Sequence, residues 1–182
     1  MNEIASKGQL RLAYLRWALV TVPAIVFLGF VSATISNSGP HNRWYMSLVK
    51  PDFMPPSWAF PVAWTILYVL MGLALAIVIH ARGARMRGLA IALFLVQLIA
   101  NLAWSPLFFR AHMVSEAFYL LVLLTATVAI TTVIFARIRI GAALLMVPYL
   151  AWLCFAATLN FAIDRLNPDA PTLVVPAFRS QI

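Results

Sequence analysis

Charged and apolar residues are strongly segregated along this chain of 182 residues. Five stretches of 20 to 29 residues contain no Asp, Glu, Lys or Arg, and together they cover 121 positions. About 20 apolar residues of helix cross the roughly 30 Å hydrocarbon core of a bilayer, so each stretch is long enough to span it. The pattern predicts five transmembrane helices, at residues 14–36, 57–80, 88–109, 115–136 and 141–163.

The predicted fold class is an all-α integral membrane protein, a bundle of five transmembrane helices. Only helices and closed barrels satisfy their backbone hydrogen bonds within lipid, and the continuous apolar runs lack the alternation of barrel strands. Three short connections make successive helices antiparallel neighbours. The expected parts of the chain are a basic segment at 1–13, a membrane domain at 14–166 with a long loop at 37–56, and a proline-containing tail at 167–182.

Composition and charge support this membrane location. Apolar residues make up 64% and charged residues 10%, against about 45–50% and 25% in soluble domains. These values exclude a soluble enzyme domain, a disordered chain and a disulfide-stapled module. The net charge of +8 sits in small basic groups at the ends of the spans, as in proteins that contact lipid headgroups. The expected partners are therefore membrane lipids, and no nucleic acid.

The basic residues also predict an orientation. The amino-terminal side of the bundle collects eight Lys and Arg residues and the opposite side five, so the positive-inside rule places the amino terminus in the cytoplasm. The first span has an alternative interpretation as a cleavable signal peptide. A mature chain that begins near Ser32 or Thr34 would retain four spans.

Candidate chemistry inside the spans is limited. They hold no Asp, Glu, Lys or Arg, which argues against ion or proton coupling. Three scattered histidines and one cysteine do not have metal-ligand spacing. We therefore predict no metal site, no acid–base catalytic residue and no required cofactor. Cys154 lies in an apolar run and is expected to be a small core residue.

Aromatic residues, which make up 13% of the chain, form stripes at helical spacing in three predicted helices. Each stripe mixes rings with amide or hydroxyl groups on one helix face. The stripes are Phe60, Trp64 and Tyr68; Gln97, Asn101 and Trp104; and Tyr149, Trp152, Ala156 and Asn160. Facing one another, they would line an apolar pocket suited to a flat hydrophobic ligand. Interfacial aromatics and helix-joining amides give the same pattern, so both interpretations stay open.

The long loop is rich in aromatic residues and proline. Its prolines restrict the backbone and disfavour regular helix. A stiff loop of this kind suits a lid over a pocket, and a loop that rests on lipid headgroups is the alternative. The candidate lid residues are Trp44, Lys50, Pro51, Pro55 and Pro56.

Several motifs follow one another along the chain. They are Trp44-Tyr45-x-x-Leu48-x-Lys50-Pro51 with Pro55-Pro56; Phe60-Pro61-x-x-Trp64-x-x-Leu67-Tyr68; Gln97-x-x-x-Asn101-x-x-Trp104-x-Pro106-x-Phe108-Phe109; and Pro148-Tyr149-x-x-Trp152, Leu159-Asn160-Phe161 and Arg165-Leu166-Asn167. Together they resemble the TspO/MBR family, which comprises bacterial tryptophan-rich sensory proteins and the mitochondrial translocator protein, or peripheral benzodiazepine receptor. The resemblance covers about residues 14–167.

The resemblance implies a five-helix bundle, commonly a homodimer, with a pocket that opens toward the first loop. Family members bind porphyrins, including protoporphyrin IX and haem, and isoquinoline-carboxamide and benzodiazepine drugs. For this chain it implies a membrane receptor or sensor, in a bacterial membrane, with porphyrin or haem as the ligand. The candidate ligand-binding residues, from the stripes and the resemblance together, are Tyr45, Trp64, Tyr68, Gln97, Asn101, Trp104, Tyr149, Trp152 and Ala156.

The family resemblance implies further activities that would use the same pocket. One is light- and oxygen-dependent degradation of protoporphyrin IX, in which Trp64 and Trp152 would take part. Another is passive translocation of porphyrin or lipid across the bilayer. The family also has a sterol-recognition pattern near the end of the last helix, and such patterns are weak. Leu159, Phe161 and Arg165 match it, except that phenylalanine replaces tyrosine.

Overall fold

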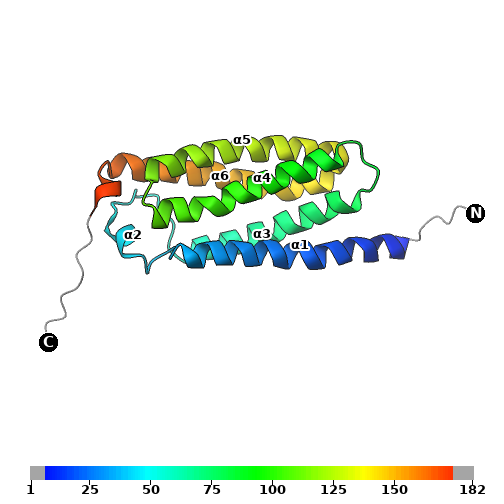
Figure 1. Ribbon diagram of the computed structural model, residues 1–182, viewed down its shortest axis with the longest axis horizontal. Helices are drawn as coiled ribbons and strands as arrows, with labels where there is room; N and C mark the ends of the chain where they lie inside the picture. The colour runs from blue at the N-terminus through cyan, green and yellow to red at the C-terminus, as the bar shows by residue number, and fades with distance from the viewer. Residues whose placement is uncertain (1–6, 174–182) are drawn as a thin grey trace, which may run out of the picture.

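The computed structural model describes residues 7–173, which form helices and no strand (Figure 1). The elements are α1 (Lys7–Ile35), α2 (Arg43–Ser47), α3 (Ala59–His80), α4 (Arg87–Ser105), a π-helical turn (Pro106–Arg110), α5 (Val114–Ile138), α6 (Ile140–Leu166) and a 3₁₀ turn (Ala170–Thr172). Residues 1–6 and 174–182 of the predicted terminal segments lie outside the described residues.

Five segments of the described chain are long and apolar enough to cross a membrane. They are Leu12–Ile35, Ala59–His80, Arg87–Arg110, Val114–Ile138 and Ile140–Leu166. Each includes most or all of one predicted span, because a charge-free apolar run of this length is stable in lipid only as a helix. The predicted all-α, multi-pass membrane fold with five spanning helices is confirmed.

The spanning helices lie side by side along the long axis of the molecule (Figure 1). α1 packs on α3, α3 on α6, α6 on α5 and α5 on α4, while α4 also touches α1 and α3. The short connection between α3 and α4 predicts closely packed neighbours, but α3 packs mainly against α1 and α6. The five helices therefore surround one shared interior.

Small residues let α1 and α3 approach closely. A Cβ atom at Gly72 would lie 2.6 Å from Cα of Val22, and a Cβ atom at Gly29 would overlap the ring of Tyr68. Thr21 Oγ1 donates a 2.8 Å hydrogen bond to the carbonyl of Gly72. Close contact of this kind stabilises helix pairs in lipid, where apolar burial alone gives little advantage.

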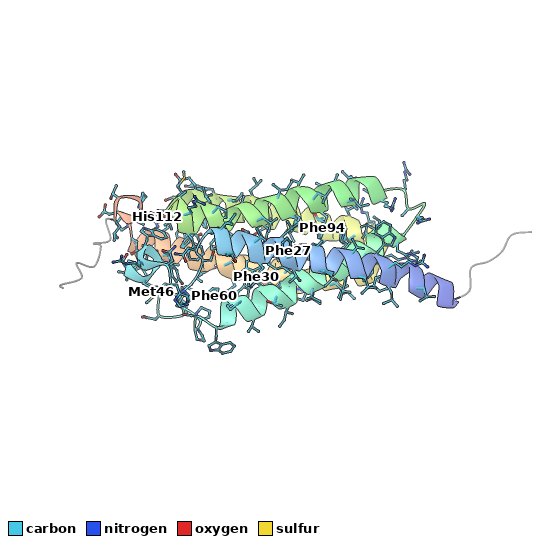
Figure 2. All side chains as sticks on the ribbon, turned by 60° about the horizontal axis from the view of Figure 1, so that its bottom comes forward. Phe27, Phe30, Met46, Phe60, Phe94 and His112 are labelled. Atoms are coloured by element: carbon cyan, nitrogen blue, oxygen red, sulfur yellow. The ribbon has the colours of Figure 1, made fainter. Side chains whose placement is uncertain are left out.

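Large apolar side chains cover the outside of the bundle. Phe27 and Phe30 on α1 are 66% and 74% exposed (Figure 2), as expected for side chains that meet acyl chains. Cys154 is also exposed, so its prediction as a core residue is wrong. It follows the fully buried Leu153 and is turned about 100° from it on α6, toward the lipid side.

The connection between α1 and α3 contains a short helix that the sequence analysis did not predict. α2 ends at Ser47, ahead of Pro51, and Oδ1 of Asn42 caps it by accepting a 2.9 Å hydrogen bond from the Tyr45 N–H. Met46 of α2, Phe60 and His112 all lie near the same end of the bundle (Figure 2). We call this end, at which residues 36–58, 111–113 and 167–173 meet, the loop end.

Candidate functional site

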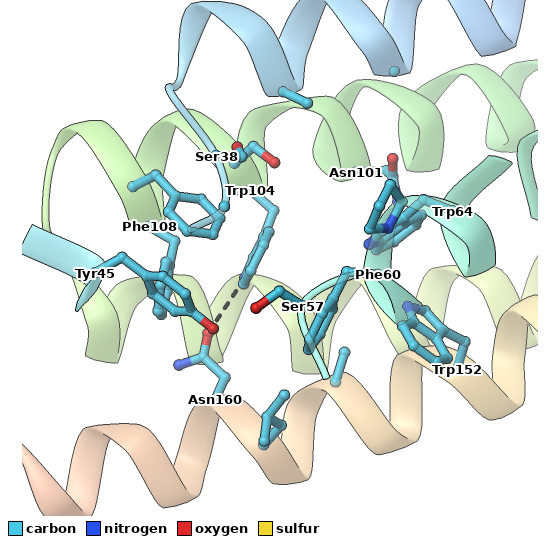
Figure 3. Close-up of a pocket in the computed structure, with 18 of the residues that line it drawn as sticks. Ser38, Tyr45, Ser57, Phe60, Trp64, Asn101, Trp104, Phe108, Trp152 and Asn160 are labelled. Atoms are coloured by element: carbon cyan, nitrogen blue, oxygen red, sulfur yellow. Dashed lines mark hydrogen bonds between the residues drawn. The ribbon is translucent and has the colours of Figure 1, made fainter. Parts of the chain in front are cut away.

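A cavity of about 650 Å³ lies between the helices in the half of the bundle next to the loop end. This volume is within the range of about 300–1,000 Å³ that is typical of small-molecule sites. None of the described residues that line it is charged. Its principal rings, drawn in Figure 3, are Tyr45, Phe60, Trp64, Trp104, Phe108 and Trp152. We call this space the aromatic cavity.

The rings present flat faces in different directions. The indoles of Trp64 and Trp152 are 6.4 Å apart and nearly perpendicular, at 83°. Trp64 stacks on Tyr68 at 5.4 Å, and Trp104 stacks on Phe108 at 5.1 Å. Perpendicular and offset pairs are the favoured arrangements of aromatic side chains. The pairs thus hold the faces that surround the cavity in fixed orientations.

A chain of hydrogen bonds lies beneath the aromatic cavity and joins α3, α4 and α6. The Tyr68 hydroxyl donates to Asn101 Oδ1 at 3.0 Å, and Asn101 Nδ2 donates to the Tyr149 hydroxyl at 2.9 Å. The Tyr149 hydroxyl in turn donates to Gln97 Oε1 at 3.1 Å. Because both polar atoms of the Asn101 amide are held in this way, its orientation at the edge of the cavity is fixed.

Two further polar groups face the aromatic cavity nearer the loop end. Asn160 Oδ1 accepts a 3.3 Å hydrogen bond from Trp104 Nε1 (Figure 3), and Asn160 Nδ2 donates to the carbonyl of Val114 at 2.8 Å. The buried hydroxyl of Ser38 has no hydrogen-bond partner within the described chain. A buried polar group without a partner is costly, which makes Ser38 a candidate hydrogen-bonding residue of the cavity lining.

The candidate ligand-binding residues separate into two layers. Gln97 and Tyr149 are fully buried below the cavity and do not line it. The other seven candidates line it: Tyr45, Trp64, Tyr68, Asn101, Trp104, Trp152 and Ala156. The helical spacing of the three stripes therefore brings most of these side chains to one space, and their part in ligand binding stays a prediction.

None of the candidate lid residues lines the aromatic cavity, and their role as a lid stays a prediction. Trp44 is only 3% exposed. Its ring stacks on His112, with the ring centres 4.2 Å apart, and its Nε1 donates a 2.9 Å hydrogen bond to the Ala170 carbonyl. Desolvation lowers the pKa of His112 below its ordinary value because burial disfavours the charged imidazolium.

The other lid residues support the same loop. Lys50 Nζ donates to the carbonyls of Tyr45 and Leu48 at 2.9 and 3.2 Å and lies 4.7 Å from the centre of the Tyr45 ring. Desolvation lowers the pKa of Lys50 and raises that of Tyr45. Pro51 is buried, whereas Pro55 is half-buried and Pro56 exposed. Lys50 thus holds Tyr45, a loop aromatic that lines the cavity.

Sequence reasoning missed the contribution of α1 to the cavity. Gly29 and Ala33 of α1 line it, and so does Ser38, three residues beyond the end of α1, yet this part of the chain has no aromatic–amide stripe. The available signal was a pair of small residues at a spacing of four, which favours close helix contact. A second missed feature is Phe155, which lies in α6 between the stripe residues and also lines the cavity.

The residues of the weak sterol pattern lie on different faces of α6. Leu159 is buried and lines the aromatic cavity. Phe161 is 42% exposed, and the guanidinium carbon of Arg165 lies 5.2 Å from the centre of its ring. A ligand on the outer face of α6 would therefore meet Phe161 and Arg165 but not Leu159.

The amino-acid sequence is similar to those of several known proteins. The sequence model of the TspO/MBR family matches residues 19–166, a range that includes every residue lining the aromatic cavity. The chain is 41% identical over 142 residues to the tryptophan-rich protein TspO of Chlorobaculum tepidum, which covers 78% of this chain and 89% of that protein. It is 39% identical over 130 residues to the tryptophan-rich sensory protein of Cereibacter sphaeroides, a match that covers 71% of this chain and 80% of that protein. It is also 38% identical over 131 residues to the human translocator protein, a match that covers 71% of this chain and 78% of that protein.

Proposed function

Since this chain belongs to the TspO/MBR family, we propose that it is a membrane receptor or sensor that binds porphyrins and other flat hydrophobic ligands. The observation that carries this proposal is the aromatic cavity, which has rings on several sides and no charged side chain among the described residues that line it. The names of the relatives, a sensory protein and a translocator protein, favour the same role.

The cavity chemistry favours a ligand with a flat apolar body and few polar groups. A macrocycle inserted beside Trp64 and Trp152 would stack on one indole and meet the edge of the other, both of which are favourable. Asn101 and Ser38 would supply hydrogen bonds to polar groups at its edge. Ionised propionates are costly to bury without a cation, so they would remain toward the loop end.

Titration of protoporphyrin IX against the purified full chain in detergent tests this proposal. The porphyrin absorbance band should shift saturably. Trp64→Leu and Trp152→Leu should each raise the Kd about tenfold, which corresponds to the loss of about 1.4 kcal/mol of stacking and contact. Trp17→Leu is the control, because Trp17 does not line the aromatic cavity, and its Kd should match that of the unmodified protein. Unchanged affinity in both cavity variants would contradict the proposal.

Porphyrin degradation in light and oxygen is a second candidate, and the adjacency of two indoles at the cavity favours it. Trp64 and Trp152 lie 6.4 Å apart, so excited porphyrin in the cavity would meet an oxidisable ring on two sides. Illumination of the complex in air should bleach the porphyrin band faster than illumination of porphyrin in empty micelles. Trp64→Phe and Trp152→Phe should slow the loss at saturating porphyrin. Equal rates with and without protein would exclude this activity.

A further inference from the structure

A second hollow lies at the opposite end of the bundle from the aromatic cavity. It is an open groove of about 1050 Å³ between the beginning of α1, the end of α3 and the junction of α5 and α6. Arg16, Arg82 and Arg139 line it together with Tyr14 and Trp17. We call it the basic groove.

The basic groove combines cationic and apolar surface. The three arginine side chains are exposed, whereas Tyr14 and Trp17 are half-buried. Between them the lining includes Ile77, which is half-buried, and Ala81, which is buried. A ligand seated here would therefore meet apolar side chains and guanidinium groups at the same time.

Negative charge is absent from this end of the described chain. The four described acidic residues all lie toward the loop end: Asp52, Glu116, Asp164 and Asp169. Within residues 7–173 the guanidinium groups of Arg16 and Arg82 have no hydrogen-bond or ion-pair partner, and the guanidinium of Arg139 donates through Nη1 to the carbonyl of Ile138, at 3.2 Å. The sole remaining acid of the sequence, Glu3, lies outside the described residues. The guanidinium groups thus have donors to spare for an anion.

The position of the groove defines the kind of anion. Leu12 begins the first membrane-spanning segment and His80 ends the second, and both line the groove. The groove therefore lies where the hydrocarbon core meets the headgroup layer, the depth at which Trp and Tyr are enriched. Basic hollows between spanning helices at this depth suit anionic headgroups, and a guanidinium binds phosphate oxygens in a bidentate manner.

We propose that the basic groove binds an anionic phospholipid. Its phosphate would lie at Arg16, Arg82 and Arg139, and the part of an acyl chain nearest the headgroup would lie on Ile77 and Ala81. The apolar part of the lining distinguishes this ligand from a free phosphate ion, which would gain nothing from it. The site is separate from the aromatic cavity and does not depend on the proposed porphyrin binding.

Native mass spectrometry of the full chain in detergent measures this binding directly. Dioleoyl phosphatidylglycerol, dioleoyl phosphatidylcholine and inorganic phosphate are titrated separately, so that headgroup charge and acyl chains are varied independently. Phosphatidylglycerol should bind at least tenfold more tightly than phosphatidylcholine, and millimolar inorganic phosphate should not displace it. Equal binding of the two lipids, or displacement of phosphatidylglycerol by inorganic phosphate, would overturn the proposal.

A matched pair of double variants separates a specific site from general surface charge. Arg16→Gln/Arg82→Gln removes two groove arginines, whereas Arg85→Gln/Arg137→Gln removes two exposed arginines at the same end that do not line the groove. The groove variant should lose about 30-fold in phosphatidylglycerol affinity, since each arginine near a headgroup contributes about 1 kcal/mol. The control should lose less than about threefold, because neither arginine lines the groove and the attraction between an exposed charge and a headgroup that it does not contact is weakened by salt.

Two checks keep this comparison interpretable. Circular dichroism should show the same helicity in both double variants, and protoporphyrin binding should be unchanged in both. Arg82→Lys keeps the charge but loses the planar fork, so it should have an affinity between those of the unmodified protein and the groove variant. Equal losses in the groove variant and its control would show diffuse attraction only and would contradict a defined site.

Discussion

Tyr149 is the residue on which the hydrogen bonds below the aromatic cavity depend. It is fully buried, accepts from Asn101 and donates to Gln97. Tyr149→Phe would leave Asn101 Nδ2 and Gln97 Oε1 without these partners, so it should lower the free energy of unfolding by about 1–3 kcal/mol. Denaturant unfolding in detergent checks this value. Tyr119→Phe is the control, because Tyr119 is 69% exposed; equal stability of the two variants would contradict the role given to Tyr149.

His112 should make the stability of the loop end depend on pH. Its pKa is lowered in the folded protein by desolvation, so the unfolded chain, with a histidine pKa of about 6.5, binds the proton more readily. The stability that the neutral His112 contributes is therefore fully present above about pH 6.5, and it is lost as the pH falls toward the lower folded-state pKa. The unfolding temperature should decrease as the pH is lowered from about 7.5 to about 5.5.

His112→Asn should flatten that pH dependence. Asparagine tolerates the positive φ of 60° at this position better than most residues, so the backbone can keep its conformation. The same substitution at the exposed His41 is the control, and the slope of His112→Asn should be flatter than the slope of this control. A slope that persists in His112→Asn and disappears in His41→Asn would refute this assignment.

At the residue scale, the sequence predicted the side chains whose spacing repeats and missed those placed by tertiary contacts. Trp64, Asn101 and Trp152 belong to helical stripes, and a helical stripe defines a shared face before any neighbour is known. Ser38 lies just after α1 and lines the cavity only because of how that end packs. The contact of Trp44 with Ala170 joins residues 126 positions apart, which no local pattern predicts.

At the scale of elements, the contact of α1 with α3 depends on Gly72. A Cβ atom there would meet the backbone of Val22 at 2.6 Å, and backbone cannot move aside as a flexible side chain can. Gly72→Ala should therefore lower the free energy of unfolding by about 1–3 kcal/mol. Gly88→Ala and Gly141→Ala are matched helical controls with open space around the added atom. They should raise stability by as much as about 1 kcal/mol, because alanine favours helix; destabilisation by all three to the same degree would contradict close packing at Gly72.

The charge pattern predicts the spans more accurately than it predicts the helix ends. Charge-free runs mark the hydrocarbon core, but a helix continues into the headgroup layer, where charged side chains are solvated. α5 therefore includes Arg137, only Arg139 separates it from α6, and α1 includes Arg16. α2 was missed because the prolines of this loop predict a lack of helix throughout it. In the structure Pro40 precedes α2 and the other prolines follow Ser47, so none of them interrupts the helix.

At the scale of the whole molecule, charge divides the protein into three layers. Within the described residues, arginines without acids occupy one end, an interior without charge occupies the middle, and the acidic residues lie at the loop end. The sequence predicted this division from the order of charges alone. Its orientation across the membrane, with the basic end in the cytoplasm, stays a prediction of the positive-inside rule. An uncharged interior lined by indoles favours stacking on a flat ligand over ion coupling or acid–base catalysis.

The central claim, that the aromatic cavity receives the ligand, is tested most directly by ¹⁹F NMR of the full chain labelled with 5-fluorotryptophan. Each of the six tryptophans gives its own resonance, assigned by single Trp→Phe variants. On addition of protoporphyrin IX, the ring current of the macrocycle should shift the resonances of Trp64, Trp104 and Trp152 saturably and leave that of Trp17, in the basic groove, unchanged. A saturable shift of Trp17 with no change at Trp64, Trp104 and Trp152 would contradict the account.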